Sequence, residues 1–302
     1  MTVEIARRVG SSAVDLAYER FGDPGSPPLL LIMGLATQML GWPEGFCSAL
    51  VAQGLHVIRF DNRDIGLSTH VHDAPAPDVM AALAGDTRSA SYTLSDMARD
   101  AVGLHDALAL DSAHIVGASM GGMIAQTIAI EHPERVRSLT SIMSTTGDNK
   151  VGQATQAALG ALLSPPATTR EQAVERTVSV YRVIGSPGFE LDEAELRKRA
   201  GLAYDRANDP PGVARQFLAI IASGDRTPAL RSLSVPTLVI HGADDPLVNV
   251  SGGRATAEAV PDAALVVYDG MGHDLPRALW PEIASRIAEL VQRTEPAARP
   301  RA

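Results

Sequence analysis

The sequence predicts an α/β protein in which a buried, mostly parallel β-sheet is flanked by helices and interrupted by one helical insertion. Short apolar runs of strand length recur along the chain, and most are followed by a helical pattern. Runs that are apolar throughout are typical of parallel strands that are covered on both faces. The runs expected to form this sheet are residues 29–33, 56–60, 114–116, 139–143, 237–240 and 264–268.

One earlier strand and several helices complete the predicted core. Val14, Leu16 and Tyr18 are spaced two residues apart, which predicts a half-exposed, antiparallel edge strand before the parallel ones. Helical spacing of apolar residues, with Asp, Ser or Pro near several starts, predicts the flanking helices. These helices are residues 94–108, 120–131, 253–259 and 280–292.

The alternation of strands and helices stops after residue 143 and resumes near residue 231. In between, helical patterns are broken by stretches rich in Pro and Gly at 164–166, 185–188 and 209–212. We therefore expect residues 1–148 and 231–302 to form one core domain. Residues 149–230 are expected to form a helical cap that is inserted between two strands.

Charge and cysteine content restrict the class of partner and the compartment. The 26 Lys and Arg residues are outnumbered by 35 Asp and Glu, and the formal charge of −9 disfavours nucleic acid or an anionic membrane. Cys47 is the single cysteine and is expected to be a packed core thiol, as in a reducing compartment. The first ten residues lack an apolar signal region, and no run approaches about 18 apolar residues. We expect a cytoplasmic protein with a small-molecule partner. Whether it forms a homo-oligomer is left open by the sequence.

Residues 117–121 read Gly-Ala-Ser-Met-Gly, which is the G-x-S-x-G pattern. The pattern lies between a predicted strand and a predicted helix, and this context is typical of a nucleophile elbow. Glycine neighbours without Cβ atoms let the strand and the helix approach closely while the serine adopts a strained backbone. Ser119 is therefore the predicted nucleophile.

A serine nucleophile needs a base, and the base needs an acid that orients it. His273 lies in a glycine-bracketed loop after the last predicted strand, and Asp245 follows the strand before it. The chain order Ser, Asp, His is the one expected of such sites. Asp244 is the less favoured acid because an Asp in this position commonly bonds to turn backbone. We predict that His241 has a structural role.

Two backbone amides are expected to form an oxyanion hole. Met120 follows the nucleophile, and Leu35 follows Gly34 in the loop after an early strand. Gly34 and Trp42 are predicted to line the substrate pocket. The sequence contains no H-E-x-x-H motif and no cluster of Cys and His, so neither a metal nor a cofactor is expected.

These residues resemble the α/β-hydrolase superfamily and, more closely, aclacinomycin methylesterase-like bacterial carboxylesterases. The resemblance extends from about residue 14 to residue 292, and its motifs are Leu31-Ile32-Met33-Gly34, Gly41-Trp42-Pro43, Arg59-Phe60-Asp61-Asn62-Arg63-Asp64, Gly117-Ala118-Ser119-Met120-Gly121 and Gly270-Met271-Gly272-His273. It implies an α/β-hydrolase fold with an eight-stranded, mostly parallel sheet and a helical cap. It further implies hydrolysis through an acyl-enzyme without a cofactor, with Ser119, Asp245 and His273 as the triad. We interpret Asp61, Arg63 and Asp64 as structural.

The sequence thus predicts a serine hydrolase that cleaves a small carboxylic ester, such as a methyl ester. A lactonase, a carbon–carbon bond hydrolase or a cofactor-free perhydrolase with the same triad remain alternatives. A non-catalytic receptor with a hydrolase fold is a more remote one. An epoxide hydrolase or a haloalkane dehalogenase is disfavoured, because both need a carboxylate where this chain has Ser119.

Overall fold

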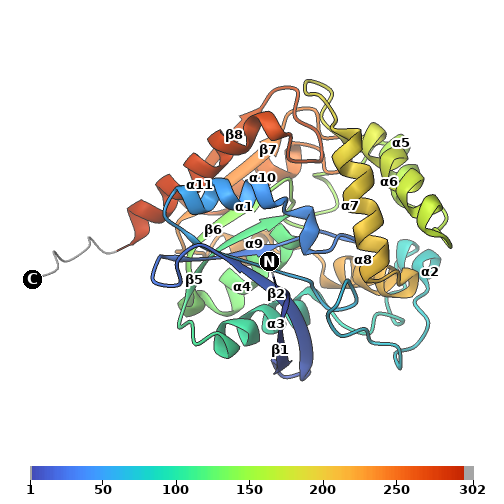
Figure 1. Cartoon of the computed structure of the whole chain (residues 1–302), viewed down its shortest axis with the longest axis horizontal. Helices are drawn as coiled ribbons and strands as arrows, with labels where there is room; N and C mark the ends of the chain where they lie inside the picture. Colours follow the sequence, from blue (N-terminus) through green and yellow to red (C-terminus); the bar gives the residue numbers. More distant parts are fainter. Residues whose placement is uncertain (1, 296–302) are drawn as a thin grey trace, which may run out of the picture.

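The fold is built on one eight-stranded sheet, seen in the computed structural model of the chain, which describes residues 2–295 (Figure 1). The strand order is β1-β2-β4-β3-β5-β6-β7-β8; β2 pairs antiparallel with β1 and β4, and the remaining pairs are parallel. The expected fold class is confirmed. The strands are β1 (Glu4–Val9), β2 (Val14–Phe21), β3 (Pro28–Ile32), β4 (His56–Phe60), β5 (Ala113–Ala118), β6 (Val136–Ile142), β7 (Thr237–Gly242) and β8 (Ala264–Tyr268).

The prediction that the early strand is a half-exposed edge was wrong. β2 lies inside the sheet, and the side chains of Val14, Leu16 and Tyr18 are only 4%, 0% and 7% exposed. The edge strand at this end of the sheet is β1, which has the sequence Glu-Ile-Ala-Arg-Arg-Val and carries three charged residues in six. Five of its six residues are at least partly exposed or small, so β1 has no strong hydrophobic pattern that would reveal it.

Helices cover both faces of the sheet, and the alternation of side chains along the strands divides the core into two halves. Leu30 and Ile32 of β3 belong to the apolar cluster that includes α3 and α4, whereas Leu29 and Leu31 belong to the cluster with α1 and α11. Each buried strand thus supplies apolar side chains to both halves. The helices are α1 (Glu44–Ala52), α2 (Val79–Leu83), α3 (Leu94–Ala107), α4 (Met120–Glu131), α5 (Gln156–Leu162), α6 (Arg170–Ile184), α7 (Glu193–Arg206), α8 (Pro210–Ser223), α9 (Thr227–Leu230), α10 (Ser251–Ala259) and α11 (Trp280–Thr294).

Residues 149–230, here called the 149–230 segment, contain helices α5 to α9 and no strand, and they lie between β6 and β7 in the chain. Figure 1 shows α5 to α8 grouped at one side of the molecule, apart from the helices that cover the sheet. Side chains of Thr155, Thr169 and Asp192 accept a backbone N–H in the first turns of α5, α6 and α7. Such N-caps satisfy helix donors that would otherwise lack a partner.

Buried ion pairs join the 149–230 segment to the loop after β4. Arg206 at the end of α7 pairs with Asp61, and Arg215 of α8 forms two hydrogen bonds of 2.8 and 2.7 Å with Asp64. Arg63 in the same loop pairs instead with Asp100 of α3 at 2.5 Å. Asp61, Arg63 and Asp64 are thus all engaged in holding elements together, in agreement with their structural interpretation.

Within residues 2–295, no helix has both the length and the apolar composition that crossing a membrane requires.

Candidate active site

Ser119 occupies a sharp turn between β5 and α4. Its backbone has φ 57° and ψ −121°, a left-handed conformation that costs a non-glycine residue roughly 1–3 kcal/mol. The surroundings hold this conformation: the Ser119 N–H donates to the Ile142 carbonyl at 2.9 Å, and the Ser119 carbonyl accepts from the Ser144 hydroxyl at 2.8 Å. The turn therefore keeps the hydroxyl-bearing carbon at a fixed place above the sheet.

Three glycines make this turn sterically possible. A Cβ atom at Gly117 would overlap the carbonyl of Gly121, and a Cβ atom at Gly121 would overlap the carbonyl oxygen of Ile32. At Gly122 a Cβ atom would come within 2.6 Å of Ser144 Cβ. The motif glycines are required because strand and helix backbones meet too closely here for any side chain.

The structure brings Ser119, His273 and Asp245 into one hydrogen-bonded chain. His273 Nε2 lies 3.0 Å from Ser119 Oγ, and His273 Nδ1 lies 2.7 Å from Asp245 Oδ2. Because a carboxylate only accepts hydrogen bonds, Nδ1 carries the ring hydrogen and the Nε2 lone pair faces the serine hydroxyl. These residues follow β5, β8 and β7, so the carboxyl ends of three parallel strands place them together.

The two neighbouring aspartates have different partners. Asp245 is buried, and its second oxygen, Oδ1, accepts the N–H groups of Leu247 and Val248 at 2.9 and 2.8 Å. Asp244 instead accepts the Gly270 N–H at 2.8 Å and so ties the two loops together. The structure thus places Asp245 on the histidine and gives Asp244 a structural role.

His241 lies close to Asp245, but its hydrogen bond is to a different residue. Its Nε2–H donates to the Val248 carbonyl at 2.7 Å, while Asp245 Oδ2 is 3.6 Å away. Burial lowers the pKa of His241, so the ring is neutral at physiological pH. Its position supports the acid loop rather than the serine.

The loop that carries His273 is held in place by residues of the 149–230 segment. The sequence did not predict this contact. The His273 N–H donates to the Ile184 carbonyl at 2.7 Å, and the Ser186 hydroxyl accepts the Gly272 N–H at 2.9 Å and donates to Asp274. Residues 185–188 were recognisable only as a Gly- and Pro-rich break. Nothing local in the sequence says which distant loop such a break will contact.

The loop after β3 lies against the nucleophile. A Cβ atom at Gly34 would be 3.0 Å from Ser119 Cβ, so Gly34 is next to the serine. The Ala36 N–H donates to Gln216 Oε1 of α8 at 3.2 Å, which holds this loop from the 149–230 segment. Within residues 2–295, neither the Leu35 N–H nor the Met120 N–H donates to a protein acceptor.

Trp42 does not line a pocket. Its side chain has no exposed surface and stacks on Phe46 with ring centroids 5.6 Å apart, within the apolar cluster of α1 and α11. The prediction that Trp42 belongs to the substrate pocket was therefore wrong. A large aromatic side chain is equally suited to a core and to a pocket wall, so its type alone could not decide.

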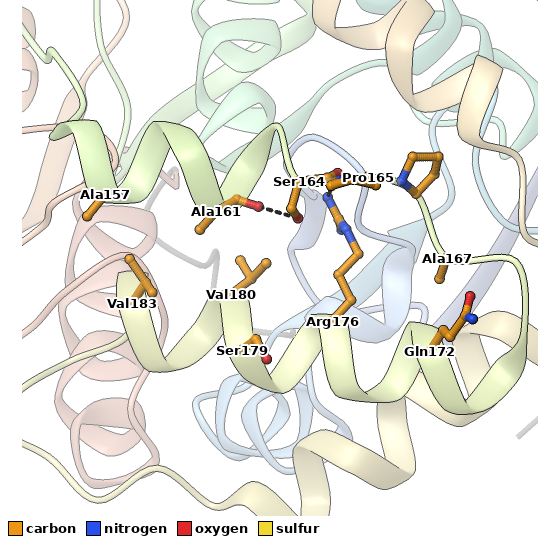
Figure 2. A pocket seen from close by; sticks show the side chains of 11 residues that line it. Ala157, Ala161, Ser164, Pro165, Ala167, Gln172, Arg176, Ser179, Val180 and Val183 are labelled. Atoms are coloured by element: carbon orange, nitrogen blue, oxygen red, sulfur yellow. Dashed lines mark hydrogen bonds between the residues drawn. The ribbon is translucent and has the colours of Figure 1, made fainter.

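A cavity of about 600 Å³ lies between α5 and α6 (Figure 2). Ala157 and Ala161 face it from α5, and Val180 and Val183 face it from α6. Val183, which lines this cavity, directly precedes Ile184, whose carbonyl accepts the His273 N–H.

Fold and site together define an α/β hydrolase with a serine, histidine and aspartate in contact. The family model for the alpha/beta hydrolase fold matches residues 27–276. The chain belongs to this family.

Three similar proteins refine the comparison. Rhodomycin D methylesterase DauP of Streptomyces sp. is 32% identical over 93% of this chain and 96% of its own length. The 3-oxoadipate enol-lactonase 2 of Acinetobacter baylyi is 28% identical over 85% of both chains. The solved esterase RhEst1 of Rhodococcus sp. is 21% identical over 98% of this chain and 100% of its own, with a TM-score of 0.74, which supports the fold.

Proposed function

We propose that this protein is a serine esterase in which Ser119, His273 and Asp245 act as the catalytic triad. The observation that carries the proposal is the hydrogen-bonded chain from Ser119 Oγ through His273 to Asp245. Family membership and the similarity to a methylesterase make the chain a carboxylic ester hydrolase. The assignment as an ester hydrolase thus rests on the relatives, and the roles of the three residues rest on the geometry.

The mechanism follows from the positions of the three side chains. Ser119 Oγ attacks the ester carbonyl while His273 Nε2 takes the hydroxyl proton, and Asp245 stabilises the imidazolium that forms. The N–H groups of Leu35 and Met120 donate to the oxyanion of the tetrahedral intermediate. His273 then returns the proton to the departing alcohol. A water molecule attacks the acyl-enzyme by the same sequence, which releases the acid and restores Ser119.

The proposed substrate is a methyl ester whose acid part carries an apolar body. The relative DauP is named for a methyl ester, and the cavity between α5 and α6 offers apolar walls of Ala157, Ala161 and Val180. The 149–230 segment would then act as a cap over the substrate. We place the enzyme in the cytoplasm, which accords with its single, buried cysteine.

Replacing the nucleophile tests the triad. In Ser119→Ala, kcat/KM for p-nitrophenyl acetate should fall by about 10⁴-fold or more, because no other group supplies the attacking oxygen. Labelling by a fluorophosphonate should disappear as well. The surface variant Ser95→Ala is the control and should keep both. Labelling that persists in Ser119→Ala would assign the nucleophile to another residue.

Replacing a small residue of the cavity tests the substrate. If the acid part of a large ester occupies this cavity, Ala161→Trp should raise KM for a bulky aromatic methyl ester about tenfold and leave p-nitrophenyl acetate, which is too small to extend that far, unaffected. An equal effect on both esters would contradict the assignment of the cavity.

A lactonase is the second candidate, and the similarity to the enol-lactonase favours it. Ring opening uses the same attack by Ser119, but the leaving oxygen stays attached to the acyl group. A panel of simple lactones beside open-chain esters separates the two. Higher kcat/KM for lactones than for every ester in the panel would favour the lactonase.

A further inference from the structure

We propose that His70, His72 and Asp209 form a binding site for one transition-metal ion of the Zn²⁺ class. The two histidines lie in the loop after β4, and Asp209 directly precedes α8. This site is separate from the hydrogen-bonded chain at Ser119. No sequence pattern indicates this site, because His70 and His72 alone do not form a metal-binding motif and Asp209 lies far along the chain.

The three side chains converge on one point. His70 Nδ1 is 2.6 Å and His72 Nδ1 is 4.0 Å from the same oxygen, Asp209 Oδ2. The two imidazole rings are stacked, with centroids 5.5 Å apart and planes at 9°. One ligand atom from each residue lies within 4.8 Å of the others, and residues 2–295 contain no second such group of His, Cys, Asp and Glu.

The second ring nitrogen of His70 favours a cation at this point. His70 Nε2 lies 3.0 Å from the Gly66 carbonyl oxygen, which can only accept a hydrogen bond, so Nε2 carries a hydrogen. In the neutral ring, the Nδ1 lone pair then faces the Asp209 carboxylate at 2.6 Å. A positive charge belongs between two such atoms: it is either the Nδ1 proton of an imidazolium or, once the two atoms separate slightly, a bound metal ion. A histidine that binds a metal typically donates its other N–H to a backbone carbonyl in this way.

The ligand set selects the kind of ion. Two imidazole nitrogens and one carboxylate suit Zn²⁺, whereas Mg²⁺ and Ca²⁺ prefer oxygen ligands. Ligands of a tetrahedral Zn²⁺ are about 3.4 Å apart. The His70 and Asp209 atoms must therefore separate slightly and His72 must approach. The side chain of His72 is 71% exposed and can rotate toward the ion, leaving a coordination position open to water.

The neighbouring charges leave the site net negative. Arg215 Nη2 is 3.5 Å from Asp209, but this guanidinium makes its two short hydrogen bonds with Asp64. One positive charge is thus shared between two carboxylates. An ion bound here would join the loop after β4 to the start of α8 and would stabilise the packing of the 149–230 segment against the core.

Zinc binding by the tag-free, metal-stripped protein tests this site. Calorimetry should find one Zn²⁺ bound at this site, and saturating Zn²⁺ should raise Tm by roughly 3 °C or more, whereas Mg²⁺ should have no effect. In His72→Ala the affinity should fall by about tenfold or more, and the rise in Tm should be lost. Because the side chain of His72 is exposed, this variant should fold as wild type does.

The matched control is Asp73→Asn, which removes an exposed charge next to His72 and should leave zinc binding unchanged. Zinc held by His273 would persist in His72→Ala, so the two sites are distinguished without an activity measurement. The proposal is overturned if wild type shows no rise in Tm, or if His72→Ala and Asp209→Asn bind Zn²⁺ as wild type does. His70 and Asp209 would then form an imidazolium–carboxylate ion pair.

Discussion

Ser119 and His273 are held in place in two different ways. Ser119 is fixed by the sheet itself, through a backbone hydrogen bond to β6 and through glycines that allow α4 to touch β3 and β5. His273 lies on a loop whose backbone is hydrogen-bonded to residues 184–188 of the 149–230 segment. The nucleophile therefore depends on the core, and the base depends on the placement of a surface helical segment.

This difference separates stability from activity. Damage to the turn at Ser119 forces apart elements of the core, so it should lower the free energy of unfolding. Damage to the contact between residues 184–188 and the histidine loop displaces one side chain at the edge of the core, so it should slow the reaction first. The following variants test this separation, from the largest expected effect to the smallest.

Gly121→Ala should have the largest effect on stability. The added Cβ atom would overlap the Ile32 carbonyl, and neither backbone can retreat, so the free energy of unfolding should fall by roughly 3 kcal/mol. Urea unfolding measures the change. Gly160→Ala is the matched control: a Cβ atom at this helical position of α5 meets open space, and the same substitution should stabilise by about 0.5–1 kcal/mol. Equal stability of the two variants would contradict the steric argument.

Gly272→Ala should affect activity more than stability. Its Cβ atom would overlap the carbonyl of Gly185, and the histidine loop would move away from residues 184–188. A displacement of about 1 Å at His273 should lower kcat about 10²-fold. Ester kinetics and Tm measured on the same sample test this. A large fall in Tm with normal kcat would reverse the assignment of this contact.

Ser186→Ala should have a smaller effect of the same kind. It leaves the Gly272 N–H without its acceptor and Asp274 without its hydroxyl donor, while the His273 N–H keeps its bond to Ile184. We expect kcat to fall about tenfold with KM nearly unchanged, because part of the support remains. Restoration of kcat in Ser186→Thr would assign the effect to the hydroxyl. A change in KM alone would place Ser186 at the substrate instead.

The pH dependence of stability should show the smallest effect. Burial raises the pKa of Asp274 above its usual value, although the Ser186 hydrogen bond opposes this. The folded protein then binds a proton at a higher pH than the unfolded chain does. Protonation of Asp274 therefore stabilises the folded protein at acid pH, and this stabilisation is lost as pH rises through the raised pKa. Asp274→Asn should therefore stabilise the protein more at pH 7 than at pH 4 in urea unfolding. A gain that is larger at pH 4 would contradict the raised pKa.

Much of the fold and the core of the site follow from local patterns. The G-x-S-x-G motif between a strand and a helix indicated the turn at Ser119, and glycines after a late strand indicated the loop of His273. These signals are local because strand ends and tight turns restrict the residues that they contain. They suffice to name the three residues that the structure brings together.

Features that arise from packing between distant segments could not be predicted. Nothing in residues 185–188 indicates the histidine loop as their partner, and nothing in Asp209 indicates His70. The edge strand β1 was missed because solvent on one side removes the need for an apolar pattern. Trp42 was misplaced because aromatic character serves a core and a pocket equally.

The buried thiol of Cys47 has a practical consequence for studying motion. Cys47 has no exposed surface, and burial raises its pKa to about 12, so the folded protein presents no reactive thiolate at neutral pH. The native chain is therefore already suitable for single-site labelling. A cysteine introduced at Leu202, which is 47% exposed on α7, would carry a fluorophore without any prior cysteine removal. Movement of α7 during turnover could then be followed in an otherwise unaltered enzyme.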